Sequence, residues 1–214
     1  MSERTQRQGP NAQSVFFRAI TDHLETVKGI AAQQEMLERV ARAMAGVLRE
    51  GGRILWCGNG GSAGDSQHLA AEIVGRFRRE RRGLASIALT TDTSILTAVA
   101  NDYGYEAVFA RQVEALGQAG DLLVGISTSG NSPNVVAALE MARSLRMKTV
   151  GFTGEGGGRM AGLCDFLFAA PSRDTARVQE AHILVGHMLC DWVEMDWLEH
   201  AAEQAEGNSA GVSR

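Results

Sequence analysis

Two spacings of apolar residues alternate along the chain. Short apolar runs predict five strands, at 54–56, 86–89, 122–126, 149–152 and 166–168. Between them apolar residues recur every three or four positions, which predicts helices over about 66–77, 94–100, 105–116, 133–145 and 176–203. Strands that alternate with helices are typical of βαβ units. We therefore expect an α/β fold in which helices cover both faces of a doubly wound, five-stranded parallel sheet.

Two further helical patterns precede the first predicted strand. The first contains Val15, Ile20 and Leu24, and the second extends to Leu48 before the glycine pair 51–52, a typical helix end. Residues 1–11 and 204–214 are polar and lack periodicity, so we expect flexible tails there. A single domain that begins with a pair of helices is thus expected over residues 12–203.

Composition narrows the possible partners. The 214 residues are 44% hydrophobic and 21% charged, as in one soluble domain with a sizeable core, and the formal net charge is -4. This charge gives no overall positive field for nucleic acid or an anionic membrane, so we expect a small-molecule ligand. The three cysteines form no C-x-x-C pair, which argues against disulfides and a thiolate zinc site and favours a reducing cytoplasm. No apolar stretch is long enough to span a bilayer.

A glycine-rich loop follows the first predicted strand and contains Asn59, Gly60 and Gly61. Glycines permit positive φ and let backbone N–H groups face a bound anion, while the next helix offers its positive end. A plain tight turn is one alternative. A dinucleotide site is another, because G-x-G-x-x-A is present, but the acidic residue expected about 20 positions later is missing.

A second loop, after the third predicted strand, carries four hydroxyl groups: Ser127, Thr128, Ser129 and Ser132. Pro133 suits the first position of a helix whose N-cap is Ser132. Hydroxyls and helix-end amides can hold a phosphate group without a lysine, and an ordinary Ser-Pro helix start needs fewer hydroxyls. In open parallel sheets ligands bind at the carboxyl ends of strands, where both loops lie. The two loops together predict an anion pocket.

Titratable residues follow on two predicted helices. His68 and Glu72 are four apart and share one helix face, which suits a metal pair, an acid–base pair or a surface contact. Gln179 and His187 are eight apart on the last helix, about 12 Å along its axis. Both could therefore hold one metal ion only with extended side chains or across a subunit boundary.

Two other segments have simpler interpretations. N-D-Y-G at 101–104 predicts a loop, either a plain turn or a place where Asn101 and Asp102 act as ligands. The arginines between 76 and 82 predict a solvated helix end that the helix dipole favours, with nucleic-acid binding as the lesser alternative. We interpret His182 as a packed histidine.

Together these motifs resemble the SIS (sugar isomerase) domain family, and within it the phosphoheptose isomerases. The matching segments extend over 12–198 and include G-N-G-G-S-A at 58–63, N-D-Y-G-Y at 101–105 and S-T-S-G-N-S-P-N at 127–134. The resemblance implies the sheet predicted above and a cytoplasmic homotetramer with the N-terminal helices at its centre. It also implies active sites shared between subunits, which would let Gln179 and His187 reach one metal ion.

The resemblance further implies a reaction. D-sedoheptulose 7-phosphate would become D-glycero-D-manno-heptose 7-phosphate through an enediol(ate), the first step toward the heptose of lipopolysaccharide or related glycans. Glu72 would be the base and His187 its partner in oxygen protonation, with one zinc ion per subunit polarising the carbonyl. The implied substrate contacts are Asn59, Gly60, Gly61, Glu72, Asn101, Asp102, Ser127, Thr128, Ser129, Ser132 and Gln179. The implied zinc ligands are His68, Glu72, Gln179 and His187.

One relative in the same superfamily suggests a different function. A replication initiator-associating protein has this fold without being an isomerase, and resembles the chain in its loops. It lacks equivalents of Glu72 and His187, which are present here, so the catalytic interpretation is favoured. One departure from the isomerase pattern concerns Ala176, where some isomerases have aspartate; Asp174 is the candidate replacement.

Overall fold

The computed structural model describes residues 12–211, with side chains over residues 14–203. Its centre is a parallel sheet of five strands in the order β2-β1-β3-β4-β5. The strands are β1 (Ile54–Gly58), β2 (Ser86–Ala88), β3 (Leu122–Ser127), β4 (Lys148–Thr153) and β5 (Phe166–Ala169). Strands β1 and β3 are buried at every position, as expected for parallel strands covered on both faces. The predicted fold class is confirmed.

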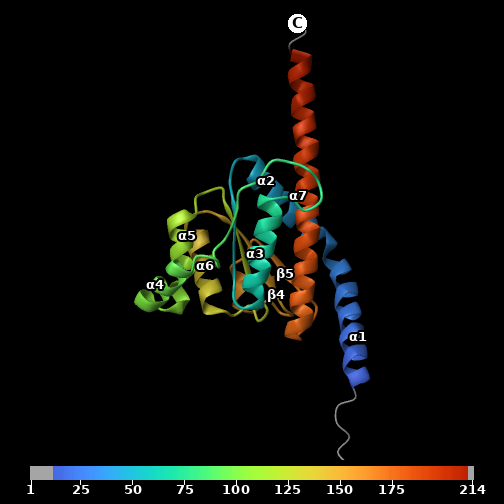
Figure 1. Cartoon of the computed structure of the whole chain (residues 1–214), viewed down its shortest axis with the longest axis vertical. Coiled ribbons are helices and arrows are strands. Elements are labelled where there is room, and N and C mark those ends of the chain that lie inside the picture. Colours follow the sequence, from blue (N-terminus) through green and yellow to red (C-terminus); the bar gives the residue numbers. More distant parts are fainter. Residues whose placement is uncertain (1–11, 212–214) are drawn as a thin grey trace, which may run out of the picture.

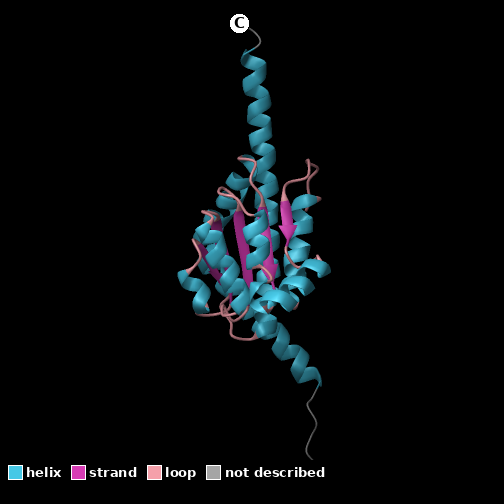
Figure 2. Cartoon of the chain, turned by 90° about the vertical axis from the view of Figure 1, so that its left-hand side faces the viewer, coloured by secondary structure: helices cyan, strands magenta, loops and turns pink. Residues whose placement is uncertain are grey.

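Each face of the sheet carries its own layer of helices (Figure 1, Figure 2). One layer contains α2 (Gln34–Arg49), α3 (Gly61–Val74) and α7 (Thr175–Gly211). The other contains α4 (Thr93–Tyr103), α5 (Ala110–Leu116) and α6 (Pro133–Ser144). Side chains of β1 alternate between the layers, because Ile54 and Trp56 pack in the first core and Leu55 and Cys57 in the second.

The predicted N-terminal pair of helices is also present. Helix α1 (Ala12–Ile30) is followed by the short 3-10 helix η1 (Ala31–Gln33) and then by α2. Helix α2 packs its buried face on the sheet, whereas α1 lies outside the sheet layers and contacts α7 (Figure 1). In the part of the chain that the structure describes, no helix has the length and apolarity needed to cross a membrane.

Several element boundaries differ from those predicted. Helix α3 begins at Gly61 rather than near 66, because Gly60 at φ 56° turns the chain straight from the strand into the helix. The helix predicted over 105–116 is divided into the 3-10 helix η2 (Tyr105–Ala107) and α5. Helix α7 continues through residues 204–211, where a tail was predicted. The tail residues 1–11 and 212–214 lie outside the described part.

The strand order places both loops beside one crevice. After β1 the chain crosses to β2 on one side of the sheet, and after β3 it crosses to β4 on the other side. Adjacent parallel strands whose connections diverge leave room at their carboxyl ends, which is where such sheets bind ligands. The register pairs Gly58 with Ile126, so the two loops begin at the same level.

Candidate active site

The first loop is built for close approach of the backbone. A Cβ at Gly58 would lie 2.7 Å from the carbonyl oxygen of Ser62, so the turn excludes any side chain at this position. No side chain caps the start of α3. The N–H groups of Ser62, Ala63 and Gly64 donate to the carbonyls of Asn59 and Gly60, and the positive end of the helix faces the crevice. This geometry suits the anion loop predicted from the sequence.

Two asparagines join the first loop to the start of α6. The Asn59 amide donates to Asn134 Oδ1 and the Asn134 amide donates to Asn59 Oδ1, each at 2.8 Å. The Tyr105 hydroxyl donates to the same Asn59 oxygen at 3.2 Å. Neither Asn134 nor Tyr105 was predicted as a site residue, because only the fold shows that they meet Asn59. The signal was the continuation of both motifs, N-D-Y-G-Y and S-P-N.

The second loop gathers three hydroxyls at the N-terminus of α6. Ser127 Oγ is 2.9 Å from Ser132 Oγ and 3.4 Å from Ser129 Oγ. Ser132 occupies the predicted N-cap position before Pro133, but its hydroxyl faces Ser127 instead of capping the helix. The helix end and the hydroxyls are thus both directed at the same place, an arrangement suited to a phosphate group.

A glycine-rich segment after β4 supports this second loop from behind. A Cβ at Gly130 would lie 2.1 Å from the carbonyl oxygen of Gly157. The Gly154 N–H donates to the carbonyl of Thr128 at 2.9 Å, and the Met160 N–H donates to that of Gly130 at 3.1 Å. No role was predicted for G-E-G-G-G at 154–158, although its glycine content marks a close backbone approach.

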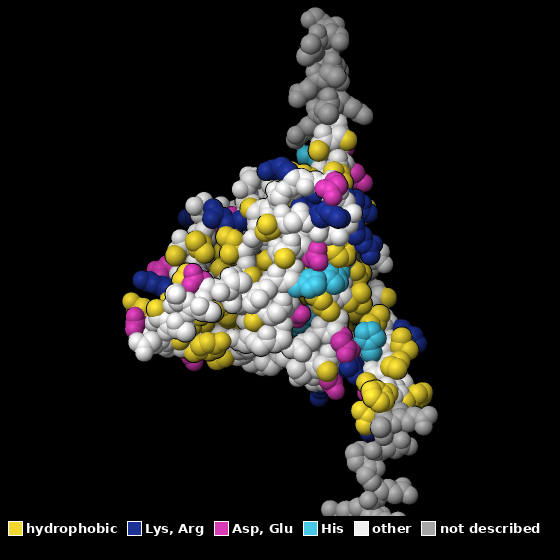
Figure 3. Space-filling view, viewed as in Figure 1, with side chains coloured by type: hydrophobic (Ala, Val, Ile, Leu, Met, Phe, Trp, Pro, Cys, Tyr) yellow, Lys and Arg dark blue, Asp and Glu magenta, His cyan; other side chains and the backbone are white. Residues whose placement is uncertain are grey.

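A group of three titratable side chains lies where α3 and α7 run side by side. His68 Nε2 is 3.1 Å from Glu72 Oε1 and 3.0 Å from His187 Nε2. The helices approach closely at this point, since a Cβ at Gly186 would lie 2.5 Å from the Leu69 side chain. Histidine side chains accordingly gather on the surface over these two helices (Figure 3).

These three residues, which we call the His–Glu group, have the chemistry of a metal site. Their ligand atoms lie within 4.8 Å of one another. Two imidazoles and a carboxylate are a common donor set of catalytic zinc sites, which keep a further position open. Burial lowers the pKa of His187 and His68 acts in the same direction, partly opposed by Glu72. Both effects favour the neutral imidazole that a metal ion or a transferred proton needs.

The Gln179 side chain lies apart in space from the other three predicted zinc ligands. A Cβ at Gly61 would meet its amide nitrogen at 2.3 Å, so the side chain rests on the start of α3. His68 is seven residues further along that helix, about 10 Å along the axis. The structure therefore brings Gln179 to the first loop and does not bring it to the His–Glu group of the same chain.

Asn101 and Asp102 are not in a loop. They form the last turn of α4, which ends at Gly104 with φ 87°, and the Asn101 amide donates to Asp102 Oδ1 at 2.8 Å. The prediction of a loop was wrong because the helical pattern of 93–100 continues through both residues. Both are exposed, and the neighbouring Tyr105 connects their segment to Asn59.

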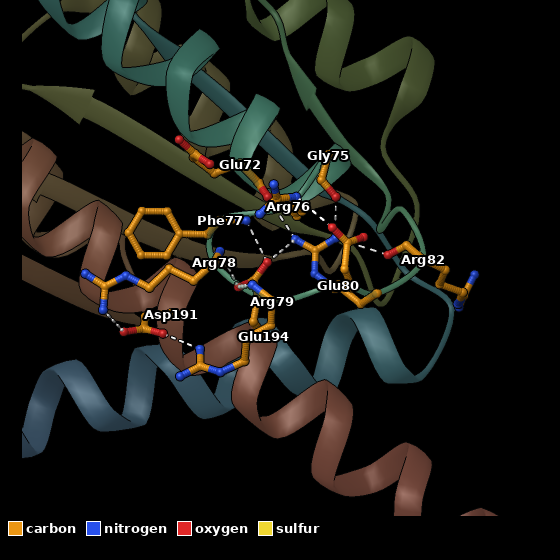
Figure 4. A network of polar contacts seen from close by, with 11 residues as sticks. Glu72, Gly75, Arg76, Phe77, Arg78, Arg79, Glu80, Arg82, Asp191 and Glu194 are labelled. Carbon is orange, nitrogen blue, oxygen red and sulfur yellow. Dashed lines mark hydrogen bonds and ion pairs between the residues drawn. The ribbon is translucent and has the colours of Figure 1, made fainter.

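The prediction of a helix end for the arginine run was wrong; Arg76, Arg78 and Arg82 are exposed as predicted, but Arg81 is not. Helix α3 ends at Val74, and the following loop folds onto α7 (Figure 4). The side chains of Arg81 and Glu194 are 0% exposed and 3.2 Å apart. Arg78 and Arg79 both pair with Asp191. Acidic partners on α7 thus neutralise much of the charge that the sequence suggested for nucleic acid.

Two further titratable residues, the half-buried Asp65 on α3 and the buried His182 on α7, have shifted pKa values. Burial raises the pKa of Asp65 to about 6, with His68 acting against it, and one Asp65 oxygen is buried without a hydrogen-bond partner. His182 is packed as predicted: its Nε2 is 2.9 Å from the Thr153 carbonyl oxygen, and burial lowers its pKa to about 4. Asp65 was not predicted as a site residue, because the pattern on this helix pointed only to His68 and Glu72.

Comparison with known proteins agrees with this geometry. The sequence model of the SIS domain matches residues 15–154. A phosphoheptose isomerase of Aliarcobacter butzleri is 55% identical over 182 residues, which are 85% of this chain and 96% of that protein. The chain belongs to the phosphoheptose isomerase family of SIS domain proteins. One solved structure of the same family is the "Structure of phosphoheptose isomerase GmhA from Neisseria gonorrhoeae", which is 43% identical to this chain. Its TM-score is 0.82, and the match covers 86% of this chain and 100% of that chain.

A second phosphoheptose isomerase structure, from Francisella tularensis, gives a similar result. It is 39% identical, with a TM-score of 0.79, and the match covers 86% of this chain and 96% of that chain. The relatives of the phosphoheptose isomerase family are named as isomerases, which confirms the expectation of an isomerase. The SIS fold implied by the resemblance is confirmed as well.

Proposed function

We propose that this chain converts D-sedoheptulose 7-phosphate to D-glycero-D-manno-heptose 7-phosphate. The observation that carries the proposal is the His–Glu group between α7 and α3, the helix that leaves the first loop, in a chain 55% identical to a phosphoheptose isomerase. Moving a carbonyl between C2 and C1 needs a base for carbon-bound hydrogen and a proton carrier for the oxygens. A carboxylate and a neutral imidazole within one group can supply these two functions.

The phosphate end of the substrate is assigned to the second loop. Ser127, Ser129 and Ser132 direct hydroxyls toward the positive end of α6, and Thr128 completes the segment. Hydrogen bonds to a charged phosphate are stronger than those between neutral groups. Phosphate bound there would leave the rest of the sugar free to extend past the first loop, where Asn59, Gly60, Gly61 and Gln179 would contact it, with Asn101 and Asp102 at its border. C1 and C2 would then reach Glu72 and His187.

The chemistry is assigned to Glu72 and His187. Glu72 takes the proton from C1, which gives an enediol(ate), and returns it to C2. His187 moves the proton of the C1 hydroxyl to the oxygen on C2, so atoms and charge balance over the cycle. The pKa of His187 is lowered, so its imidazole is neutral near pH 7 and can accept the proton of the C1 hydroxyl.

The His–Glu group also fits one zinc ion per subunit. His68, Glu72 and His187 would hold it, and Gln179 of a neighbouring subunit would complete the set, since Gln179 of the same chain rests on Gly61. Bound zinc supplies positive charge that stabilises oxyanions. A lone pair that binds a metal ion cannot also accept a proton, so we assign the firmest metal contact to His68 and the proton transfers to Glu72 and His187.

Assembly into a homotetramer is proposed from the surface of α1. Its residues Phe16, Phe17 and Ile20 are 69%, 71% and 62% exposed. Beside it an apolar cavity of about 420 Å³ lies between α1, α2 and α7, lined by residues such as Leu37 and Trp192. Figure 3 shows the hydrophobic side chains gathered along α1. Packing of α1 against other copies would cover this surface and bring neighbouring sites together.

The proposed reaction also implies a place in the cell. A heptose 7-phosphate is a precursor of heptose units in lipopolysaccharide or related glycans, and sugar-phosphate metabolism takes place in the cytoplasm, where we place this chain. Its three cysteines are free, which agrees with a reducing compartment.

A turnover assay tests the proposed function. Purified protein is incubated with D-sedoheptulose 7-phosphate, and formation of the aldose phosphate is followed by a coupled reaction. We expect turnover that a strong chelator abolishes and added Zn²⁺ restores, and no turnover of sedoheptulose that lacks the phosphate. Binding of the sugar phosphate without any turnover would contradict the isomerase and indicate the alternative, a non-catalytic SIS regulator.

A further inference from the structure

The loop that follows α3, residues 75–85, is organised around one buried carboxylate on α7 (Figure 4). The Glu194 side chain is 0% exposed and accepts backbone N–H groups of Phe77 at 2.6 Å, Arg78 at 2.8 Å and Arg79 at 3.0 Å. Three consecutive N–H donors on one carboxylate define the path of the loop much as an anion defines the path of a helix start. The loop conformation therefore depends on Glu194.

Arg81 is the charge partner of this carboxylate and continues the network toward α3. Its side chain is also 0% exposed, and its Nη2 lies 3.2 Å from Glu194. The same Nη2 donates to the carbonyl of Glu72 at 2.8 Å, and Nη1 donates to that of Gly75 at 3.0 Å. The last carbonyls of a helix have no partner within it, and here an arginine supplies one. The helix turn that carries Glu72 is thus tied to Glu194.

The loop reaches the other half of the His–Glu group through an aromatic ring. Phe77 is stacked on the His187 imidazole, with ring centroids 5.2 Å apart and an interplanar angle of 19°. The Phe77 N–H is one of the groups that Glu194 holds. One carboxylate therefore acts on both residues of the proposed proton transfer, on Glu72 through Arg81 and on His187 through Phe77.

The energetics of this network favour a role in orientation. A buried ion pair seldom stabilises a fold more than apolar side chains of the same size would, because both charges lose water. Burial would raise the pKa of Glu194, but the three N–H groups and Arg81 outweigh it and hold the pKa below its usual value. Glu194 therefore remains a charged acceptor at neutral pH, with directional bonds that apolar packing cannot provide.

We propose that Glu194 is a positioning residue for the His–Glu group: through Arg81 it sets the helix turn of Glu72, and through Phe77 it sets the ring plane of His187. The kinetic consequence rests on the proposed function. The geometric consequence does not, because a displaced His68, Glu72 or His187 also binds a metal ion more weakly, whatever reaction the site catalyses.

The test compares Glu194→Gln with Asp191→Asn. Both residues lie on α7 and both hold the same loop, but Asp191 pairs with the arginine side chains only. Supports of metal ligands are typically worth about 10–100-fold in metal affinity or activity. For Glu194→Gln we expect a 10–100-fold loss of Co²⁺ affinity, measured by its visible absorption, and a similar fall in kcat with KM within about threefold. Asp191→Asn should remain within about threefold of the wild type in all three.

A separate variant covers the case in which Glu194→Gln does not fold. Phe77→Ala removes the ring on His187 and leaves the backbone N–H, and it should also weaken Co²⁺ binding, whereas Phe77→Tyr should retain it. Folded Glu194→Gln with unchanged Co²⁺ affinity and kcat would overturn the proposal. It would do so even if the melting temperature of the variant were lower, because Glu194 would then only stabilise the fold. If Glu194→Gln does not fold, unchanged Co²⁺ affinity in Phe77→Ala would overturn it.

The two proposals fail in different ways. Wild-type protein that binds Co²⁺ but does not isomerise the sugar phosphate would contradict the proposed function alone, and the affinity comparison would still decide the role of Glu194. Wild-type protein that neither turns over the sugar phosphate nor binds Co²⁺ would contradict both, since there would be no functional group to position.

Discussion

Asp65 illustrates how burial acts on a single side chain of this site. It lies on α3 three residues before His68, and one of its oxygens is buried without a hydrogen-bond partner. Desolvation disfavours the charged carboxylate, so the folded protein retains a proton that the unfolded chain releases. An ionised Asp65 therefore costs stability, and the chain carries this cost next to its His–Glu group.

The pH dependence of stability follows from that shift. The pKa of Asp65 is raised from 3.8 to about 6 in the folded protein, so its destabilising effect grows as the pH rises from about 4 to about 6. Asp65→Asn should therefore be more stable than the wild type at pH 7.5, and the difference should vanish near pH 4. Urea unfolding at several pH values measures this. An Asn variant that is less stable at pH 7.5 would show that the carboxylate has a partner in solution.

Residue spacing predicted part of the candidate site and could not predict the rest. His68 and Glu72 are four apart on one helix, so their proximity follows from local geometry. The contact of His187 with His68 depends on how α7 packs on α3, which no local pattern contains. The buried pair of Arg81 and Glu194 joins residues far apart in the chain, so the sequence could not predict it either.

At the scale of elements, the position of the His–Glu group depends on how closely α3 and α7 approach. Gly186 precedes His187, and a side chain there would collide with Leu69 on α3. Because glycine has no side chain, the two helices touch at this position and His187 comes close to His68. At Gly64, on the same α3, a Cβ would point into open space. The two glycines therefore differ in role.

Alanine substitutions should separate these roles. Gly186→Ala forces the helices apart, and overpacking of this kind costs about 1–3 kcal/mol of unfolding free energy. Gly64→Ala only restricts the unfolded chain and should stabilise by about 0.5–1 kcal/mol. Urea unfolding measures both values. A Gly186→Ala protein as stable as the wild type would contradict the close approach of the helices.

The elements themselves were largely predictable, with informative exceptions. Short apolar runs mark all five strands, and the runs of β1 and β3 are buried throughout because both faces of the sheet are covered there. The start of α3 was missed because G-S-A-G-D-S has the composition of a loop, and the helix is stabilised by packing of residues such as Leu69 and Ile73 instead. Asn101 and Asp102 were placed in a loop for a similar reason, since Asn, Asp and Gly together resemble a turn.

At the scale of the whole molecule, α1 is the element without a complete partner. Its apolar residues Phe16, Phe17, Ile20 and Leu24 are exposed, whereas Ile30 at its end is buried, and α1 packs against α7. An exposed apolar surface of this kind marks an interface. The proposed tetramer would bury it, and would also allow Gln179 of one subunit to approach the His–Glu group of another.

The assembly can be tested by mass in solution. Phe16→Ser combined with Phe17→Ser removes two of the most exposed aromatic rings of α1, and light scattering after gel filtration should show species smaller than the tetramer of the wild type. Ile95→Ser, at an exposed apolar position on α4, is the matched control and should remain tetrameric. Wild-type protein that migrates as a monomer would contradict the proposed assembly.

The measurement that most directly tests the account is the turnover of Glu72→Gln with D-sedoheptulose 7-phosphate, beside Glu114→Gln as a control. Glu114 is a surface carboxylate on α5 paired with Arg111. General base catalysis contributes about 10²–10⁴-fold, so kcat of Glu72→Gln should fall by at least about 10²-fold while the control retains wild-type rates. A folded Glu72→Gln enzyme that retains wild-type turnover would contradict the central claim.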